Sequence, residues 1–246
     1  MLCVYVLAHF DDEYAALPLI LRDQAAGAKL SFLYNMGYRT AAEARARAAE
    51  TGRFLARFGL DPASVLHLGA ETGVPDGRLH LGAPGAYAAL QAAVARLGKV
   101  DRFVTTAWEG GHPDHDLGAA MTARLAAERG GTPVEQFSLY NAPDLPWILY
   151  HGARPLPQNG PVHRMRLTAA QRWAWAKAVA CYGSQVPVFL GLWPAMATTL
   201  LRQGDFRWQD LQPGRTAERP HPGPLHYERM FKVPYDAVRA AADSLA

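Results

Sequence analysis

Two short clusters of histidine and aspartate stand about a hundred residues apart, each directly after an apolar stretch of the chain. The first reads Ala8-His9-Phe10-Asp11-Asp12-Glu13, and the second reads Gly111-His112-Pro113-Asp114-His115. Packing alone explains such clusters poorly, whereas together they supply imidazoles and carboxylates for a divalent metal ion. Hydrolytic zinc sites keep three protein ligands and leave one position open for water. The two clusters therefore predict a hydrolytic metal centre.

The spacing of the side chains suggests which of them hold the metal. His9 and Asp12 of the first cluster, with His115 of the second, give a ligand set of two nitrogens and one oxygen. Mixed nitrogen and oxygen ligands suit zinc, although ferrous iron or cobalt would also fit. We therefore expect zinc as the cofactor, with Fe2+ and Co2+ as alternatives.

The remaining polar residues of the clusters are candidates for acid–base chemistry. Asp11 lies beside the ligands without belonging to them, so it could take a proton from water that the metal activates. His112, oriented by Asp114, could stabilise an oxyanion or protonate a leaving amine. Each cluster alone could instead mark the start of a helix, because acidic residues and Pro113 suit a first helical turn. The occurrence of both clusters favours the metal centre.

Apolar runs alternate with helical patterns through the first 140 residues, which predicts an α/β fold. We expect a Rossmann-like, mainly parallel sheet with helices on both faces. Its strands are expected at Leu2–Ala8, Leu30–Tyr34, Ser64–Leu68, Asp101–Thr106 and Val134–Tyr140, and its helices at Asp12–Gln24, Ala42–Phe58, Ala83–Leu97 and Pro113–Glu128. Open parallel sheets bind ligands at the carboxyl ends of their strands. Because both clusters follow strands, they should meet in one crevice.

The sequence changes character after residue 140. Residues 141–161 and 204–224 are rich in proline and glycine and are expected to form long loops, with a helix at Thr168–Tyr182 between them. Thr168 and Gln171 have the spacing of a capping box. No linker is evident, so we expect a single domain over residues 1–246, in which residues 141–246 shape the substrate pocket.

Composition excludes several classes of protein. Half of the 246 residues are hydrophobic, 19% are charged, and the net charge of +3 includes no basic run that would bind nucleic acid. The apolar stretch Val186–Leu201 contains two prolines and is too short to span a membrane. The start of the chain lacks the features of a signal peptide. Cys3 and Cys181 form no Cys-x-x-Cys motif and are expected to be reduced. We expect a cytoplasmic protein without stable membrane insertion; the oligomeric state stays open.

With these motifs in view, the chain resembles the PIG-L/LmbE-like family of zinc-dependent N-acetylglucosaminyl de-N-acetylases. The resemblance rests on Ala8–Glu13, which matches the family's Ala-His-Pro-Asp-Asp-Glu motif, and on His112–His115, which matches its His-Pro-Asp-His motif. Weaker similarities occur at Arg47–Glu50, at the Pro75-Asp76-Gly77 turn, and from Lys177 through Tyr182 to Gln185. Phe10 departs from the family pattern, because it stands where the family has proline. The change should reshape the turn or the pocket wall.

The resemblance implies the same roles as the spacing does: His9, Asp12 and His115 as zinc ligands, Asp11 as general base, and His112 with Asp114 as acid or oxyanion stabiliser. It also implies that Arg47 binds a substrate hydroxyl or the departing acetate. Arg47 could instead be an exposed helix residue paired with Glu50 or Glu43. Trp108 and Glu109, at the end of a predicted strand, could stack on a sugar ring and hydrogen-bond to it, or could simply pack.

The predicted function is hydrolysis of an N-acetyl group, with a small amino-sugar conjugate of the N-acetylglucosamine type as substrate. One alternative is a zinc amidase that acts on another amide, such as a thiol conjugate or an acylated antibiotic. Another is a sugar-binding module without catalysis. No Gly-x-Gly-x-x-Gly, Walker A, Gly-x-Ser-x-Gly or His-Glu-x-x-His motif occurs, which disfavours a nucleotide cofactor and a serine nucleophile.

Overall fold

A computed structural model describes residues 1–245 of the chain, except the side chains of Leu201 and Gln203. Within these residues the chain forms a seven-stranded sheet and a small two-stranded sheet. The strands are β1 (Leu2–Leu7), β2 (Lys29–Tyr34), β3 (Val65–His67), β4 (Arg102–Thr106), β5 (Val134–Phe137), β6 (Tyr140–Asn141), β7 (His151–Gly152), β8 (Val162–Arg166) and β9 (Asp205–Asp210). The helices are α1 (Asp12–Ala25), α2 (Ala41–Arg57), α3 (Gly69–Thr72), α4 (Ala83–Leu97), α5 (Pro113–Glu128), α6 (Ala169–Ala178), α7 (Val186–Gln203), α8 (His226–Met230) and α9 (Tyr235–Asp243).

The large sheet is mainly parallel. Its strand order is β3-β2-β1-β4-β5-β9-β8, and the five strands from β3 to β5 run parallel to one another. The last two strands, β9 and β8, join antiparallel. The predicted α/β class with a mainly parallel sheet is confirmed.

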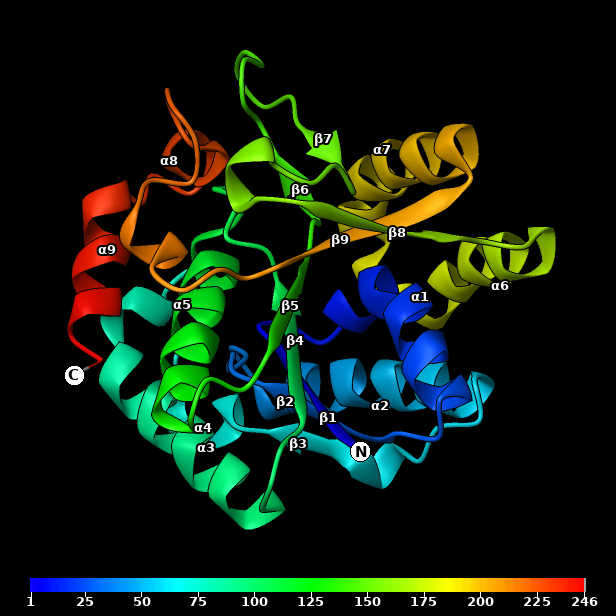
Figure 1. The fold of residues 1–246 in the computed structure, drawn as a ribbon, viewed down its shortest axis with the longest axis horizontal. Coiled ribbons are helices and arrows are strands. Elements are labelled where there is room, and N and C mark those ends of the chain that lie inside the picture. Colours follow the sequence, from blue (N-terminus) through cyan, green and yellow to red (C-terminus); the bar gives the residue numbers. More distant parts are fainter. Residues whose placement is uncertain (246) are drawn as a thin grey trace.

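Helices cover both faces of the sheet, as the central strand β1 illustrates (Figure 1). Tyr5 and Leu7 pack into an apolar cluster with residues of α1, α2, α6 and α7. Val4 and Val6 pack into a second cluster with residues of α4, α5 and α9. Successive side chains of a strand point to opposite faces, so an uninterrupted apolar run is typical of a strand that is buried on both faces.

The segment Gly204–Pro224 corrects one expectation, because it begins with strand β9 and is not a loop throughout. Phe206 and Trp208 lie on the same side of β9 and pack against the cluster around Tyr5, while polar residues alternate with them. The strand pairs with β5 on one side and with β8, which was not predicted, on the other. The expected loop at residues 141–161 likewise contains the short hairpin of β6 and β7.

Two helices in the second half of the chain bear on the sequence predictions. Helix α6 begins after Thr168, which forms the predicted capping box with Gln171, and ends earlier than expected, at Ala178. The apolar stretch after residue 185 forms helix α7, with Pro187 in its first turn and Pro194 inside it. Among residues 1–245, no helix combines the length and hydropathy that crossing a membrane requires.

The pairing of β1 with β4 sets the position of the two polar clusters. These strands are hydrogen-bonded parallel neighbours, with Val6 opposite Thr105. Both strands therefore end at the same edge of the sheet, where β1 continues into the turn before α1 and β4 continues into the turn before α5. Gly111 lies in the second turn, where a Cβ atom would overlap the backbone oxygen of Tyr140.

We expect Gly111→Ala to lower the free energy of unfolding by more than about 2 kcal/mol, because the added methyl group collides with rigid backbone. Gly118→Ala, seven residues later inside α5, is the matched control. A Cβ atom there meets nothing within 4 Å, and alanine is about 0.5–1 kcal/mol better than glycine inside a helix. Chemical denaturation of both variants tests this. Equal stabilities would contradict the tight approach at Gly111.

Candidate active site

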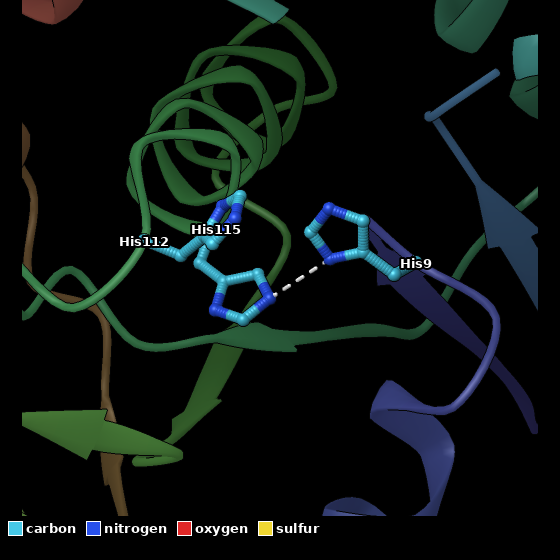
Figure 2. Close-up of side chains that lie close together, drawn as sticks. All are labelled: His9, His112 and His115. Atoms are coloured by element: carbon cyan, nitrogen blue, oxygen red, sulfur yellow. Dashed lines mark hydrogen bonds between the residues drawn. The ribbon is translucent and has the colours of Figure 1, made fainter. Parts of the chain in front are cut away.

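Three histidine rings from the two predicted clusters meet at the edge of the sheet. Figure 2 shows His9, after β1, facing His112 and His115, which lie at the start of α5. The Nδ1 atom of His9 lies 3.2 Å from Nε2 of His115. Ring nitrogens of all three residues lie within 4.8 Å of one another. Residues separated by about a hundred positions in the sequence therefore form one buried group.

Asp12 completes this group and also shapes the turn that holds His9. Its Oδ2 atom accepts hydrogen bonds from the backbone N–H groups of Ala8 and His9, at 3.0 and 2.9 Å. Its Oδ1 atom lies 3.1 Å from Nε2 of His115. Burial disfavours the charged carboxylate, but the neighbouring His115 and His9 outweigh this and lower the pKa of Asp12 well below its usual value.

Asp114 is fully buried, and its carboxylate approaches His9 as well as His112. Its carboxylate accepts hydrogen bonds from the backbone N–H groups of Gly77 and Leu79, at 2.6 and 3.0 Å. Its Oδ2 atom lies 3.3 Å from Nε2 of His9 and 3.8 Å from Nδ1 of His112. The carboxylate of Asp114 thus lies nearer to His9 than to His112, and two backbone hydrogen bonds from the 77–79 turn hold it there.

His112 is oriented by the backbone of Asp114 and by the side chain of Asp76. Its Nδ1 atom accepts the backbone N–H of Asp114 at 3.2 Å, as the cap of α5. Its Nε2 atom lies 3.4 Å from Oδ1 of Asp76. Burial lowers the pKa of His112, against the opposing effect of Asp76. The ring is therefore disposed to be neutral, with its nitrogens in distinct environments.

Asp76 is a member of the site that was not predicted as one. Its Oδ1 atom lies 3.1 Å from Nε2 of His9, in addition to its approach to His112. The turn that carries it is held against the sheet edge by pairing of Gly37 with Pro75. The Pro-Asp-Gly turn at residues 75–77 is visible in the sequence. Because it lies far along the chain from both clusters, the sequence does not indicate that it belongs to the site.

The carboxylates surround His9 in particular. Burial disfavours the charged imidazolium, but Asp76, Asp114 and Asp12 outweigh it and hold the pKa of His9 well above its usual value. The group thus attracts positive charge at its centre. Converging imidazole nitrogens and carboxylate oxygens are the donors that zinc and other divalent transition metals prefer, so this group could hold such an ion.

Asp11 lies next to the group and pairs with the predicted substrate residue Arg47. The guanidinium of Arg47 lies 3.3 Å from Oδ2 of Asp11 and donates to the carbonyl oxygen of Phe10 at 2.8 Å. Arg47 is buried, and in the structure it does not form the alternative ion pair with Glu43 or Glu50. Burial raises the pKa of Asp11 to about 7, while the charge of Arg47 opposes this increase.

The backbone at Asp11 is unusual. Its φ of 127° lies in a region that side chains other than glycine rarely adopt, and its N–H donates to Oε2 of Glu13 at 2.9 Å. Phe10, the departure from the family pattern, points away from the cavity and packs against the rings of Tyr34 and Tyr38. The turn thus buries Phe10 among these rings and places Asp11 in the wall of the cavity. Such local strain is common at active sites.

A cavity of about 260 Å³ opens above these residues. Its polar wall consists of His9, Asp11, Asp12, Arg47, Asp76, His112 and His115, and its other walls include Tyr14, Leu139, Tyr140, Gln185, Val188, Phe189, Leu192 and Phe231. A larger hollow of about 610 Å³ lies between α5, β9 and α9, and its lining contains no histidine. The smaller cavity is therefore the candidate active site.

Trp108 and Glu109 lie outside this cavity, which corrects the expectation that they contact a sugar. Trp108 is fully buried, and its indole N–H donates to the carbonyl oxygen of Glu218 at 2.9 Å. The carboxylate of Glu109 is also buried and accepts the backbone N–H groups of Leu139 and Tyr140 at 2.7 and 2.9 Å. Both side chains therefore have structural roles, and Glu109 fixes the segment that carries Tyr140 into the cavity wall.

The metal ligands can be separated from their neighbours by stoichiometry. We expect His115→Ala to lose the metal, because His115 faces both His9 and Asp12. His112→Ala should keep about one zinc per chain, because the predicted ligand set does not include it. Dialysis against zinc followed by elemental analysis gives the measurement, with the exposed His163→Ala as control. Equal loss in the His112 and His115 variants would contradict the predicted ligand set.

No family model matches the sequence, and no curated protein matches it. Solved structures do match the fold. A deacetylase of the teicoplanin biosynthesis pathway is 17% identical, with a TM-score of 0.60 over 85% of this chain and 98% of that one. N,N'-diacetylchitobiose deacetylase from Pyrococcus horikoshii is 14% identical, with a TM-score of 0.59 over 87% and 83% of the two chains.

The fold also matches GalB, the 4-carboxy-2-hydroxymuconate hydratase from Pseudomonas putida KT2440. That enzyme is 14% identical, with a TM-score of 0.55 over 86% of this chain and 96% of that one. At such identities these comparisons show a shared fold. Because the matched structures include both deacetylases and a hydratase, the shared fold alone does not specify the reaction.

Proposed function

We propose that the protein is a zinc-dependent hydrolase that removes the N-acetyl group from an amino-sugar conjugate of the N-acetylglucosamine type. The observation that carries the proposal is that Asp11, a carboxylate outside the predicted ligand set, shares one cavity with His9, Asp12 and His115. A hydrolytic zinc centre requires this combination of ligands and a neighbouring base. The fold shared with solved deacetylases supports the same choice.

In this proposal His9, Asp12 and His115 hold the metal ion. Bound zinc would polarise the amide carbonyl and make water more acidic. Asp11 accepts a proton from water while the water oxygen attacks the carbonyl carbon. Arg47 donates a hydrogen bond to the carboxylate of Asp11 and holds it in place. The guanidinium is itself held by its hydrogen bond to the carbonyl oxygen of Phe10.

His112 is suited to stabilise the oxyanion that this attack creates. Because its Nδ1 atom accepts the N–H of Asp114, a neutral ring carries its proton on Nε2. Nε2 is then a donor at the polar wall of the cavity and can bind the developing negative charge. When the carbon–nitrogen bond breaks, the amine takes the proton held by Asp11, and the products are a free amine and acetate.

The same residues support placing the chain in the PIG-L/LmbE-like family. Both family motifs contribute to the cavity, through His9, Asp11 and Asp12 on one side and His112 and His115 on the other. The N-acetylglucosamine type of substrate is proposed from that resemblance, and the diacetylchitobiose deacetylase of similar fold is consistent with it.

We expect acetate release from N-acetylglucosamine conjugates to depend on the metal. Chelator-treated protein should release none, and added zinc should restore release with one amine formed per acetate. The measurement is acetate and free amine across a panel of conjugates. Protein that binds one zinc per chain and releases no acetate from any conjugate would contradict the acetyl substrate, and amides of larger acids would then be assayed.

Asp11→Asn should lower kcat by about 10²–10⁴, the usual contribution of a general base, while leaving the bound zinc at the wild-type level. The amide keeps the shape of the side chain but cannot accept the proton. Asp236→Asn, an exposed substitution of the same kind in α9, serves as the control. A near-normal rate in the Asp11 variant would refute its assignment as base.

A further inference from the structure

An uncharged groove adjoins the catalytic cavity and shares a wall with it. The groove has a volume of about 250 Å³ and is lined by Tyr150, Val188, Leu192, Met230 and Phe231, among others. Val188, Leu192 and Phe231 line the cavity as well. The two spaces therefore adjoin along these side chains, and the groove is next to any molecule seated in the cavity.

The groove begins beside the proposed catalytic histidine. The ring of Phe231 packs edge-on against His112, with 4.3 Å between the ring centres. In an N-acetylglucosamine conjugate the acetamido group is on C2, one bond from the anomeric carbon that carries the aglycone. An aglycone must therefore leave the cavity close to the reacting amide, which is where the groove starts.

The chemistry of the groove favours an apolar occupant. No acidic or basic side chain apart from His226 lines it. Burial lowers the pKa of His226 to about 4, so this ring is neutral near pH 7. Its Nδ1 atom has no hydrogen-bond partner among the described residues, and its ring packs against Tyr150, with 5.4 Å between centres. No ionised side chain lines the groove, so a charged group would find no opposite charge there.

Exposed apolar side chains extend the groove onto the surface. Val188 is 52% exposed and Met230 is 46% exposed, although both line the groove. The hairpin of β6 and β7 lies between α7 and α8 (Figure 1), and Trp147 in its loop is 84% exposed. The hairpin contacts both helices. Thr199 of α7 donates a hydrogen bond to the carbonyl oxygen of Gly152, and Arg229 of α8 donates one to the carbonyl oxygen of Leu145. Val188 and Met230 thus present apolar surface at the groove itself, and such exposed apolar surface is typical of binding sites.

We infer that the groove lined by Tyr150, Val188, Leu192, Met230 and Phe231 binds an alkyl or aryl aglycone on the amino sugar. This inference rests on the proposed function, because it takes the cavity to hold the sugar. It narrows the substrate class to N-acetylglucosaminides with a hydrophobic substituent, and it makes the groove the part of the protein that selects them.

Binding of two simple glycosides tests the inference. Calorimetry with zinc-loaded protein compares methyl and hexyl β-N-acetylglucosaminide, the latter below its micelle concentration. Each fully buried methylene strengthens binding roughly fourfold, so five further methylenes half-buried in an open groove should lower Kd about 30-fold. A hexyl glycoside that binds less than about threefold more tightly than the methyl glycoside would overturn the inference.

A pair of variants locates the effect. Met230→Asp places a charge in the groove and should reduce the hexyl preference to a few-fold. Leu190→Asp places the same charge at a residue of α7 that is 72% exposed and lines neither space, and it should leave the preference unchanged. The ratio of the two Kd values within one variant does not depend on the folded fraction. Equal effects in both variants would overturn the assignment to the groove.

Further measurements distinguish the aglycone from other possible ligands of the groove, and distinguish failure of this inference from failure of the proposed reaction. Tighter binding of N-hexanoyl than N-acetyl methyl glycosides, without a hexyl preference, would assign the groove to the acyl group and overturn the inference. If the protein sediments with phosphatidylcholine vesicles, and Met230→Asp and Leu190→Asp weaken this equally, the apolar surface binds a bilayer. That result would also overturn the inference. Hexyl-selective binding that depends on Met230 but gives no acetate would uphold the inference and refute the deacetylase reaction instead.

Discussion

The parallel pairing of β1 with β4 is the constraint on which the site depends. These strands are neighbours in the sheet although about a hundred residues separate them, and their carboxyl ends lie at the same edge. The turn after β1 then carries His9 and Asp12, and the turn after β4 leads into α5 with His112 and His115. If the two strands lay apart in the sheet, neither cluster could complete a metal site.

Electrostatics explain why these residues are buried together. Several carboxylates around His9 would repel one another in an apolar interior, and burial alone would raise their pKa values. Each instead has partners: Asp12 and Asp114 accept backbone N–H groups, and Asp76 lies between His9 and His112. The remaining negative charge is centred where a cation can neutralise it. A divalent metal ion at this position would also be bound by the imidazole nitrogens, so the charges and the donor atoms of the site both favour the proposed cofactor.

The sequence predicted the parallel part of the fold and the meeting of the two clusters, because buried strands and short helical patterns have strong local signals. It failed where a position depends on distant segments. Trp108 was placed at a strand end correctly, but the carbonyl of Glu218, far along the chain, covers its indole. Strand β9 was hidden in a segment rich in proline and glycine, although Phe206 and Trp208 have the two-residue period of a strand. Asp76 could not be placed, since only tertiary pairing brings its turn to the histidines.

We propose that the two clusters together hold one catalytic metal ion. The most direct measurement is X-ray diffraction from crystals of the zinc-loaded protein, with data collected on both sides of the zinc absorption edge. We predict one strong anomalous peak, bounded by His9, Asp12 and His115, with the carboxylate of Asp11 beside it and not bound to it. A peak elsewhere in the chain, or zinc-loaded crystals without a peak between the two clusters, would contradict this metal site.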